Sequence, residues 1–369
     1  MTRRLALRPA SCALALAILA PAFGSRLPGE TLLLDRGLPP ANPASAAASQ
    51  LVKLRVGWSA EEGVFVTDHF TIGGLGEIWV IDRVRTWGFP SVPSAQRETL
   101  GDLFERITLY GGLESETPPA TPEAAAAECA CHGPVPIANA ELRRGSSVAE
   151  NRQVSLTPVT DADGSPYREE GRILGLWQVD FQNLRWSVPG GLNVQFGVFG
   201  LGRAASGRKN RPTWFSHGST TNGKHQFRLF GTAGNPVVPV NGSLTKDESI
   251  GINVQVWGHL TANVAIRPAG KSWQAVLLGS PTFDVTQVDQ RTLRFGPKGA
   301  APTESIVRDF NGDGHADLVL RLSAAESGVQ PAQSTACLNG RRMDGVAFEG
   351  CDSLSKPPDL PAGLRRQLP

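Results

Sequence analysis

The sequence predicts an all-β protein built from two β-sandwich domains of jelly-roll or immunoglobulin-like type. Short segments rich in β-branched and aromatic residues recur roughly every 8 to 15 residues. Gly, Pro, Asn and Asp separate these segments, and no segment of useful length follows the helical period. The pattern is typical of packed antiparallel sheets and argues against an α/β enzyme fold.

The first 24 residues have the composition of a secretory signal peptide. Three arginines precede an apolar run from about Cys12 to Ala20, and small residues follow at Ala22 and Gly24. The run is shorter than the roughly 20 residues that a membrane-spanning helix needs. We therefore expect a secreted protein, periplasmic or extracellular, with no membrane insertion.

The net charge argues against a polyanionic partner. The chain has 36 basic and 34 acidic side chains, a formal charge of +2. Loss of the signal peptide removes three arginines and no acidic residue, which leaves 33 against 34 and a charge of −1. No basic stripe remains to attract nucleic acid, so we expect no nucleic-acid partner.

Changes in composition along the chain predict the domain organisation. Small and polar residues, or clusters of Pro, Gly and Asn, indicate linkers, whereas β-rich stretches indicate domains. The expected parts are a signal peptide at 1–24, a disordered linker at 25–50, a β-sandwich at 51–233 with a disordered insertion at 114–151, a linker at 234–249, a second β-sandwich at 250–355, and a tail at 356–369.

Individual strands are expected wherever alternating or continuous apolar runs end at turn residues. In the first domain these runs are VFVTDHFTI, EIWVIDRVRTWGF, ERITLYGG, RQVSLTPV, RILGLWQVDF, LRWSV, GGLNVQFGVFG, PTWFSH and HQFRLFG. In the second they are INVQVWGHL, NVAIRP, SWQAVLLGS, TLRFG and ADLVLRL.

The second domain resembles a known module. Its stretches WQAVLLGSPTFDVTQVDQRTLRFGPKGAAP, VRDFNGDGHADLVLRL and ACLNGRRMDGVAFEGCDSL are similar to a C-terminal β-sandwich module of bacterial secreted proteins of unassigned function. VTDHFTIGG and DRVRTWGF resemble the first strands of secreted β-sandwich domains, with His69 where those domains usually have a second Asp. Both resemblances imply an exported protein with a structural or binding role, and neither implies an activity.

The segment DFNGDGHAD, residues 309–317, has the spacing of a calcium loop. Calcium takes six to eight oxygen ligands, which a loop supplies from positions 1, 3, 5, 7 and 9. These positions hold Asp309, Asn311, Asp313, the carbonyl of His315, and Asp317. We therefore predict calcium as the cofactor, in preference to magnesium, because a flexible loop of many oxygens suits the larger ion.

The residues that follow distinguish this loop from the calcium loop of an EF-hand. Position 12 is Leu320 instead of a bidentate Glu, and the apolar LVL continues as a strand. The loop resembles the strand-flanked calcium loops of integrin-type propeller blades and thrombospondin repeats. It occurs once, which excludes a propeller. The alternative is a metal-free turn rich in Asp, Asn and Gly.

Four cysteines remain after the signal peptide, and export permits disulfides. Cys337 and Cys351 bracket a segment with the turn dipeptides Asn339-Gly340 and Asp344-Gly345, so a hairpin is expected to join them in a disulfide. Cys129 and Cys131 lack the further ligands of a zinc site, and we expect a local disulfide or paired surface thiols there.

The eight tryptophans raise the question of sugar binding. Trp79, Trp177 and Trp257 lie in apolar runs and are expected in the core. Trp58, Trp186 and Trp214 are flanked by polar or turn residues and are the candidate ligand-binding residues. They would suit a carbohydrate-binding surface module.

Motifs of known catalysis are missing from the sequence. It contains no G-x-S-x-G, H-E-x-x-H, P-loop or dinucleotide fingerprint. We expect a non-catalytic, calcium-stabilised protein with a structural or surface-binding role. The sequence does not identify its partner, for which a polysaccharide or a cell-surface component is the candidate. The alternatives are a carbohydrate-binding module and a secreted hydrolase, the latter gathering His217 and His225 near Asp180.

Overall fold

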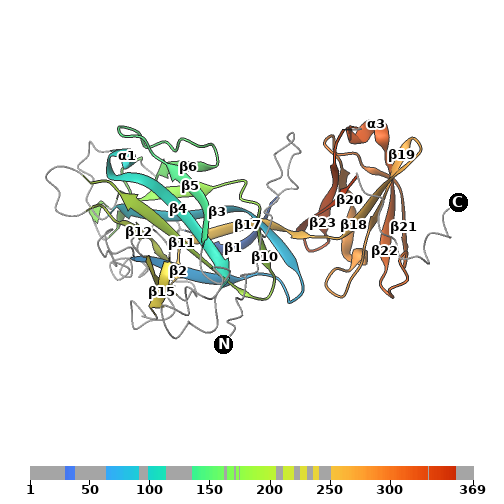
Figure 1. Cartoon of the computed structure of the whole chain (residues 1–369), viewed down its shortest axis with the longest axis horizontal. Helices are drawn as coiled ribbons and strands as arrows, with labels where there is room; N and C mark the ends of the chain where they lie inside the picture. Colours follow the sequence, from blue (N-terminus) through green and yellow to red (C-terminus); the bar gives the residue numbers. More distant parts are fainter. Residues whose placement is uncertain are drawn as a thin grey trace, which may run out of the picture.

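A computed structural model describes residues 30–37, 64–90, 99–113, 135–161, 164–169, 172–173, 175–204, 211–219, 225–230, 236–240, 251–330 and 332–354. These residues are almost entirely β-structure, which confirms the predicted fold class. The strands form three large sheets and two short ribbons, arranged as two bodies joined end to end (Figure 1). The predicted signal peptide, Cys129, Cys131, Trp58 and the tail at 356–369 lie outside the described residues.

The largest sheet runs through both bodies. Its strands follow the order β20 (Val288–Phe295), β23 (Thr335–Arg342), β24 (Ala347–Ser353), β17 (Val254–Thr261), β3 (Ile78–Pro90), β9 (Trp177–Phe181) and β6 (Val154–Pro158). Three further strands join it, namely β1 (Thr31–Arg36) on β17, with β10 (Trp186–Pro189) and β12 (Trp214–Ser216) on β3.

A second sheet faces the first-domain part of this large sheet. Its order is β15 (Pro236–Val240), β14 (His225–Phe230), β2 (Val64–Thr71), β11 (Asn193–Gly202), β4 (Phe104–Leu113) and β5 (Val135–Glu141). The ribbons pair β13 (Gly218–Ser219) with β16 (Gly251–Ile252) and β7 (Arg168–Glu169) with β8 (Arg172–Ile173).

The second domain closes with a four-stranded sheet in the order β18 (Val264–Ala269), β19 (Ser272–Leu277), β22 (Asp317–Ser323) and β21 (Pro302–Arg308). Its core contains Phe283 and Phe348, whose rings meet edge to face at 5.3 Å. The described helical turns are α1 (Leu100–Leu103), η3 (Val285–Gln287) and α3 (Ala324–Ser327). None of the helices in this part of the chain is long and apolar enough to cross a membrane.

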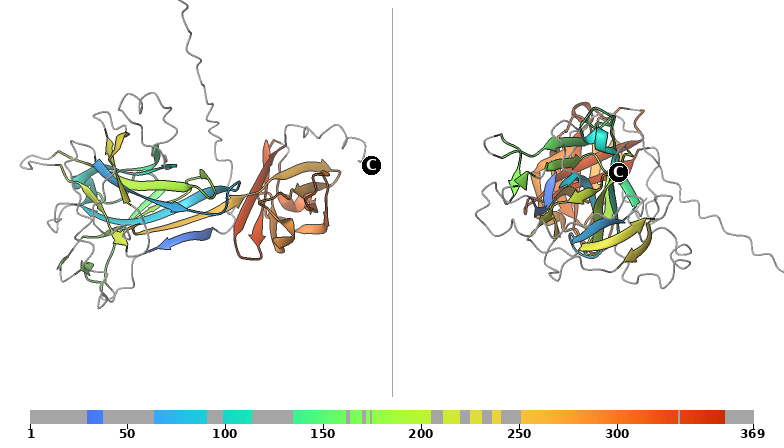
Figure 2. Two further views of the ribbon diagram at one scale, coloured as in Figure 1. Left: turned by 90° about the horizontal axis from the view of Figure 1, so that it is seen from below. Right: turned by 90° about the vertical axis from the view of Figure 1, so that its left-hand side faces the viewer.

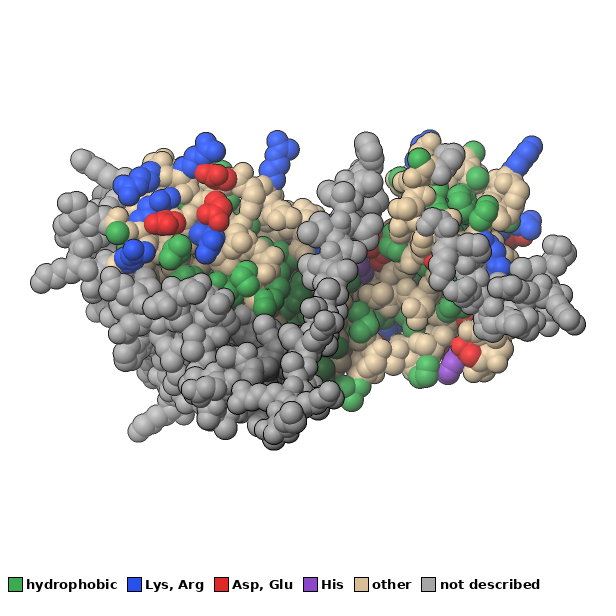
Figure 3. Space-filling view, in the orientation of Figure 1, with side chains coloured by type: hydrophobic (Ala, Val, Ile, Leu, Met, Phe, Trp, Pro, Cys, Tyr) green, Lys and Arg blue, Asp and Glu red, His purple; other side chains and the backbone are tan. Residues whose placement is uncertain are grey.

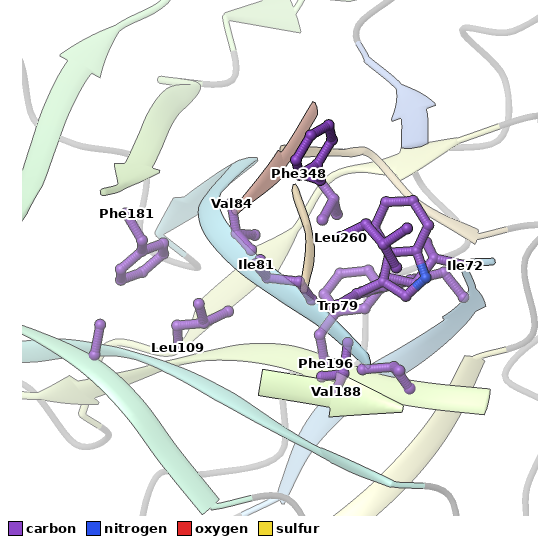
Figure 4. Close-up of a cluster of buried hydrophobic side chains, with 14 of the residues drawn as sticks. Ile72, Trp79, Ile81, Val84, Leu109, Phe181, Val188, Phe196, Leu260 and Phe348 are labelled. Carbon is purple, nitrogen blue, oxygen red and sulfur yellow. The ribbon is translucent and has the colours of Figure 1, made fainter. Parts of the chain in front are cut away.

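The first-domain core lies between its two sheets (Figure 4). The pairing of β3 with β17 is irregular between Ile81 and Arg83, so Ile81 and Val84, three residues apart, are both fully buried in this core. They meet Leu109 of β4, Phe196 of β11 and Phe181 of β9, none of which is more than 1 % exposed. Each such side chain contributes about 1.5–3 kcal/mol by leaving water.

Strand β17 links the two domains, as the left view of Figure 2 shows. Along most of its length it pairs antiparallel with β3 and with β1, and its last two residues pair parallel with β24. Leu260 of β17 lies opposite Phe348 of β24, and both are buried in one continuous apolar cluster. The backbone ladder and the core therefore both continue from one domain into the other.

The predicted linker at 25–50 is wrong where the structure describes it. Residues 31–36 form β1, which pairs with β17 from Thr31 opposite Gly258 to Arg36 opposite Val254. The run TLLLDR is short, but it finds a partner strand far along the chain that local composition does not reveal. Similarly, Val135–Glu141, predicted as part of a disordered insertion, is β5 on the edge of the second sheet.

The predicted domain boundary at 234–249 also needs correction. Residues 236–240 form β15, the hairpin partner of β14, and β17 still belongs to the sheet of the first domain. The strands β14 and β15, which precede and follow residues 231–235 in the sequence, belong to one sheet and not to two domains. The chain passes between the domains near residue 262, at the end of β17, where no Gly or Pro cluster indicates a boundary.

Charges on the first domain are mixed in sign. On the face shown in Figure 3, basic and acidic side chains of this domain are interspersed. Two exposed ion pairs of this kind are Arg143 with Glu150 and Arg106 with Glu141. Exposed pairs of this type contribute between zero and about 1 kcal/mol each to stability.

Candidate functional site

The predicted calcium loop connects two neighbouring strands of the second domain. β21 ends at Arg308, β22 begins at Asp317, and these two residues lie opposite each other in the antiparallel ladder. Gly312 and Gly314 have φ of 78° and 89°, in the left-handed region that glycine adopts without steric cost. The expectation that a strand follows the loop is confirmed.

The side chains of the loop fold back on its own backbone. Asp309 accepts hydrogen bonds from the amides of Gly312 (2.7 Å) and Gly314 (3.0 Å). Asn311 Oδ1 accepts from Asp313 N at 3.0 Å, and Asp313 Oδ1 accepts from His315 N at 2.8 Å. These bonds define the loop shape, because each one closes a turn of two to five residues.

Asp317 anchors the loop to the rest of the domain. Its side chain is fully buried, and its Oδ1 accepts from Gly279 N at 2.8 Å. Its Oδ2 accepts from Phe310 N at 2.8 Å and from Asn311 N at 3.3 Å. A buried carboxylate needs such donors, since burial without them would cost several kcal/mol.

The chemistry of the donor set suits calcium, because carboxylate and amide oxygens dominate it. Among the described residues, the carboxylates of Asp309, Asp313 and Asp317 do not converge to within 4.8 Å of one another. An ion here would therefore draw the exposed Asp309 and Asp313 away from their backbone donors. The pKa of Asp313 lies below its ordinary value, because the His315 amide and the Asn311 side chain donate to its charged form.

The Cys337–Cys351 disulfide is confirmed. The two residues lie opposite each other on β23 and β24, with Cα atoms 4.0 Å apart. The hairpin turns at Asp344-Gly345, where Gly345 has a φ of 86°, whereas Asn339-Gly340 lies inside β23. Glu349 lies close to both sulfur atoms, but the disulfide removes them as metal ligands.

Trp214 is buried, so its predicted role as an exposed platform is wrong. It is 6 % exposed, and its ring meets Phe104 edge to face at 5.7 Å. It fills the space beside Gly88, where an added Cβ would lie 2.4 Å from the indole. The polar neighbours in sequence misled the prediction, because β12 is a short strand whose alternate residues point inward.

Trp186 is half-buried and also serves packing. Its ring lies against Gly111 of β4, at 2.4 Å from the position that a Cβ would take. It thus spans the gap between the two sheets of the first domain. The described tryptophans proposed for ligand binding therefore do not form one exposed face.

A polar cluster lies where the domains meet, and no local pattern in the sequence predicts it. We call it the junction cluster, and it consists of Asp82, Arg185, His259 and Glu349. His259 Nδ1 of β17 lies 2.6 Å from Asp82 Oδ2 of β3, and both side chains are at most 2 % exposed. His259 Nε2 faces Glu349 Oε1 of β24 at 3.9 Å. Arg185 Nη1 donates to the same Glu349 oxygen at 2.8 Å.

The junction cluster connects both domains, with His259 and Asp82 buried and Arg185 at the surface. Asp82 and Arg185 belong to the first domain and Glu349 to the second, with His259 between them. Near it, burial raises the pKa of Glu30, with Arg83 opposing the shift and Asp82 adding to it. The His259 imidazole is only 2 % exposed, whereas the Arg185 side chain is 49 % exposed.

A second buried network joins the two sheets of the first domain. Arg36 Nη1 of β1 donates to Asp68 Oδ2 of β2 at 2.8 Å, and the side chains are 4 % and 0 % exposed. Arg36 Nη2 also donates to the His69 carbonyl at 3.0 Å. Ile252 N donates to Asp68 Oδ2 at 2.7 Å, and Asn253 Nδ2 to the Arg36 carbonyl at 2.9 Å. The buried charges thus have several partners.

Two of the three residues considered for a hydrolase have described side chains, and each of the two has a partner outside this set. His217 is buried, with Nδ1 at 2.7 Å from Asn253 Oδ1. Asp180 instead forms ion pairs with Arg83 and with Arg85, the second at 2.8 Å. His225 lies on β14 in the other sheet, and nothing is described of its side chain.

No family model matches this chain, and no curated protein matches it. Two solved structures that align with it are each described as a marsupial T cell receptor. One has 10 % identity and a TM-score of 0.17, covering 81 % of this chain and 98 % of that one. The other has 9 % identity and a TM-score of 0.17, covering 79 % and 64 %. TM-scores this low carry no argument about the fold or the function of this chain.

Proposed function

We propose that this chain is an exported, non-catalytic β-sandwich protein with a structural or surface-binding role, in which calcium stabilises the 309–317 loop. The observation that supports the structural role most strongly is the junction, where β17 pairs with both domains. A surface-binding protein gains affinity from a fixed orientation of its parts, because less conformational entropy is lost on binding.

Three kinds of contact fix the domains to each other. The backbone ladder continues through Leu260 opposite Phe348 and Thr261 opposite Glu349. The apolar core continues at the same pair, and the junction cluster adds the buried contact of His259 with Asp82. An interface that combines strand pairing, apolar contact and a buried hydrogen-bonded pair resists the domain motion that a flexible linker permits.

Calcium would stabilise the four-stranded sheet of the second domain next to its exposed edge strand β21. Every residue of β21 after Pro302 is exposed, and the loop after β21 is held by its own side chains and by Asp317. An ion held by Asp309, Asn311, Asp313, Asp317 and the His315 carbonyl would join β21 to the buried start of β22. The spacing of the donors and the two positive-φ glycines support this proposal.

Sugar binding through Trp214 is not proposed, because that side chain is buried. Export is tested by N-terminal sequencing of the protein isolated from outside the cytoplasm, which should begin near Ser25. An intact Met1 on mature cytoplasmic protein would contradict export. Turnover of an ester, glycoside or peptide by the full chain would contradict the non-catalytic role.

Distance measurement between the two domains tests whether the junction holds them in a fixed orientation. Spin labels would be introduced as unnatural amino acids at the exposed Val148 and Met343, since native thiols would also react with cysteine-directed labels. A narrow distance distribution is expected, as narrow as that of a control pair at Val148 and Leu192 within the first domain. A broad interdomain distribution beside a narrow control would contradict a rigid junction.

A further inference from the structure

Strand β21 is an exposed edge of the four-stranded sheet. It pairs with β22 on one side, and no strand among the described residues pairs with its other side. Ile306 is 61 % exposed and Val307 is 44 % exposed, so apolar side chains lie at the centre of a free edge. An open edge of this kind presents unpaired backbone groups that can accept a further strand.

The two faces of β21 differ in what they offer. Ser305 and Val307 lie opposite the buried Leu320 and Leu318 of β22, so they face inward. Ser305 Oγ donates to Gln290 Oε1 of β20 at 2.6 Å on that inner side. The alternate residues of β21 therefore make up the outer face.

That outer face consists of Glu304, Ile306 and Arg308, with an acidic and a basic residue placed symmetrically about an isoleucine. Glu304 is paired with Arg321 of β22 at 3.5 Å, in an arrangement that is more than half exposed. The Arg308 guanidinium lies 5.1 Å from the ring centroid of Phe310. Both charged groups are therefore accessible next to the apolar centre.

We propose that β21 pairs antiparallel with β21 of a second copy of this chain, about a two-fold axis at Ile306. In this register Ile306 lies opposite Ile306 of the second copy. Glu304 then lies opposite Arg308 of the second copy, and the symmetry repeats this ion pair on the other side of the axis. Opposite charges and apolar residues placed directly across a strand pair both stabilise the pairing.

Neighbouring registers lack this complementarity. Directly opposite residues of an antiparallel pair lie on the same face of the sheet. Outer residues therefore lie opposite outer residues only when the two-fold axis passes through one residue and not between two residues. An axis at Ser305 would place Glu304 opposite Ile306, and an axis at Val307 would place Arg308 opposite Ile306. Only the axis at Ile306 gives two ion pairs, so the charges select one register.

The contact is small, because β21 has seven residues. An interface limited to one strand pair is below the roughly 1,000 Å² expected of a stable dimer, so the association is weak and depends on concentration. Edge strands that avoid pairing often have charged side chains, especially lysine, along the edge. Here the two charges are opposite and symmetric, which favours a second copy over repulsion.

Charge reversal tests the pairing. Sedimentation equilibrium of the full chain from low to high micromolar concentration should show a monomer–dimer equilibrium. Glu304→Arg alone and Arg308→Glu alone should each weaken dimerisation by about tenfold, since each places like charges opposite each other twice. The double variant, and an equimolar mixture of the two single variants, should restore it. Thermal melting of each variant controls for folding.

Crosslinking tests the register. In Ile306→Cys the two thiols would have Cα atoms about 4.5–5.5 Å apart, within reach of a disulfide. In Val307→Cys they would be about 8 Å apart on the inner face, beyond that reach. Mass mapping should find a 306–306 disulfide in Ile306→Cys and no 307–307 disulfide in Val307→Cys. A wild-type chain that stays monomeric throughout, or a dimer unaffected by both reversals, would overturn the proposal.

Discussion

His259 Nδ1 lies 2.6 Å from Asp82 Oδ2 inside the junction between the two domains, with neither side chain more than 2 % exposed. Both residues belong to paired strands, β17 and β3, where His259 lies opposite Val80. A buried pair of this kind adds little net stability compared with apolar residues, but the loss of one partner is costly. The stability of the junction should therefore depend on both groups being present.

Asp82→Ala should lower the free energy of unfolding by about 3–5 kcal/mol, because it leaves His259 buried without its closest partner. Urea unfolding measures the loss. Arg185→Ala is the matched control, since Arg185 is 49 % exposed in its pair with Glu349 and should cost at most about 1 kcal/mol. Equal small losses in both variants would contradict the structural role of the junction cluster.

The buried pair between β1 and β2 leads to a second prediction. Asp68→Ala should destabilise the protein by about 3–5 kcal/mol, because Arg36 would remain buried without its carboxylate. Glu150→Ala removes the partner of Arg143 on the surface and should change stability by less than about 1 kcal/mol. Chemical denaturation compares the two variants. If Asp68→Ala lost no more stability than Glu150→Ala, the buried pair of Arg36 with Asp68 would not be what holds β1 to β2.

The sequence was informative where the signal was local. The alternation in EIWVIDRVRTWGF predicted β3, and the Asp344-Gly345 turn between two cysteines predicted the hairpin and its disulfide. The spacing of residues 309–317 predicted a loop followed by a strand, which the structure confirms. In each case the residues that determine the feature are close together in the chain.

Features that depend on distant partners were missed. β1 looked like a linker because its partner β17 lies more than 200 residues away, and the pairing of Arg36 with Asp68 cannot be read from either residue alone. Trp214 looked exposed because Ser216 and His217 follow it, yet those residues are buried too. The domain boundary was missed because β17 continues as one strand into the second domain, and no cluster of Gly or Pro follows its end.

Trp214→Ala should lower stability by about 3–5 kcal/mol through the cavity it leaves beside Phe104 and Gly88. Trp214→Phe should cost less, because the indole Nε1 finds no acceptor among the described residues and no hydrogen bond is lost. Thermal and urea unfolding distinguish the two variants. If Trp214→Ala kept wild-type stability, the core position of this residue would be wrong.

Asp102 should make stability depend on acid pH. The Thr99 hydroxyl and amide and the Gly145 amide donate to its carboxylate and hold its pKa below the ordinary 3.8. A lowered folded pKa means that this stabilisation is present above about pH 3.8 and is lost as pH falls through the folded value. Melting temperatures of wild type and Asp102→Asn should thus differ at neutral pH and converge in acid. A constant difference would contradict this.

Calcium binding at the 309–317 loop is tested most directly by calorimetry of the full chain in calcium and in chelator. Extracellular calcium modules often have Kd values of about 0.1–1 mM. At ten times Kd, binding should stabilise by about 1.4 kcal/mol and raise the melting temperature by several degrees. Asp313→Ala should abolish the shift, and Asp344→Ala, outside the loop in the β23–β24 turn, should keep it. Equal melting of the wild-type protein with millimolar calcium and with chelator would contradict the calcium-stabilised scaffold.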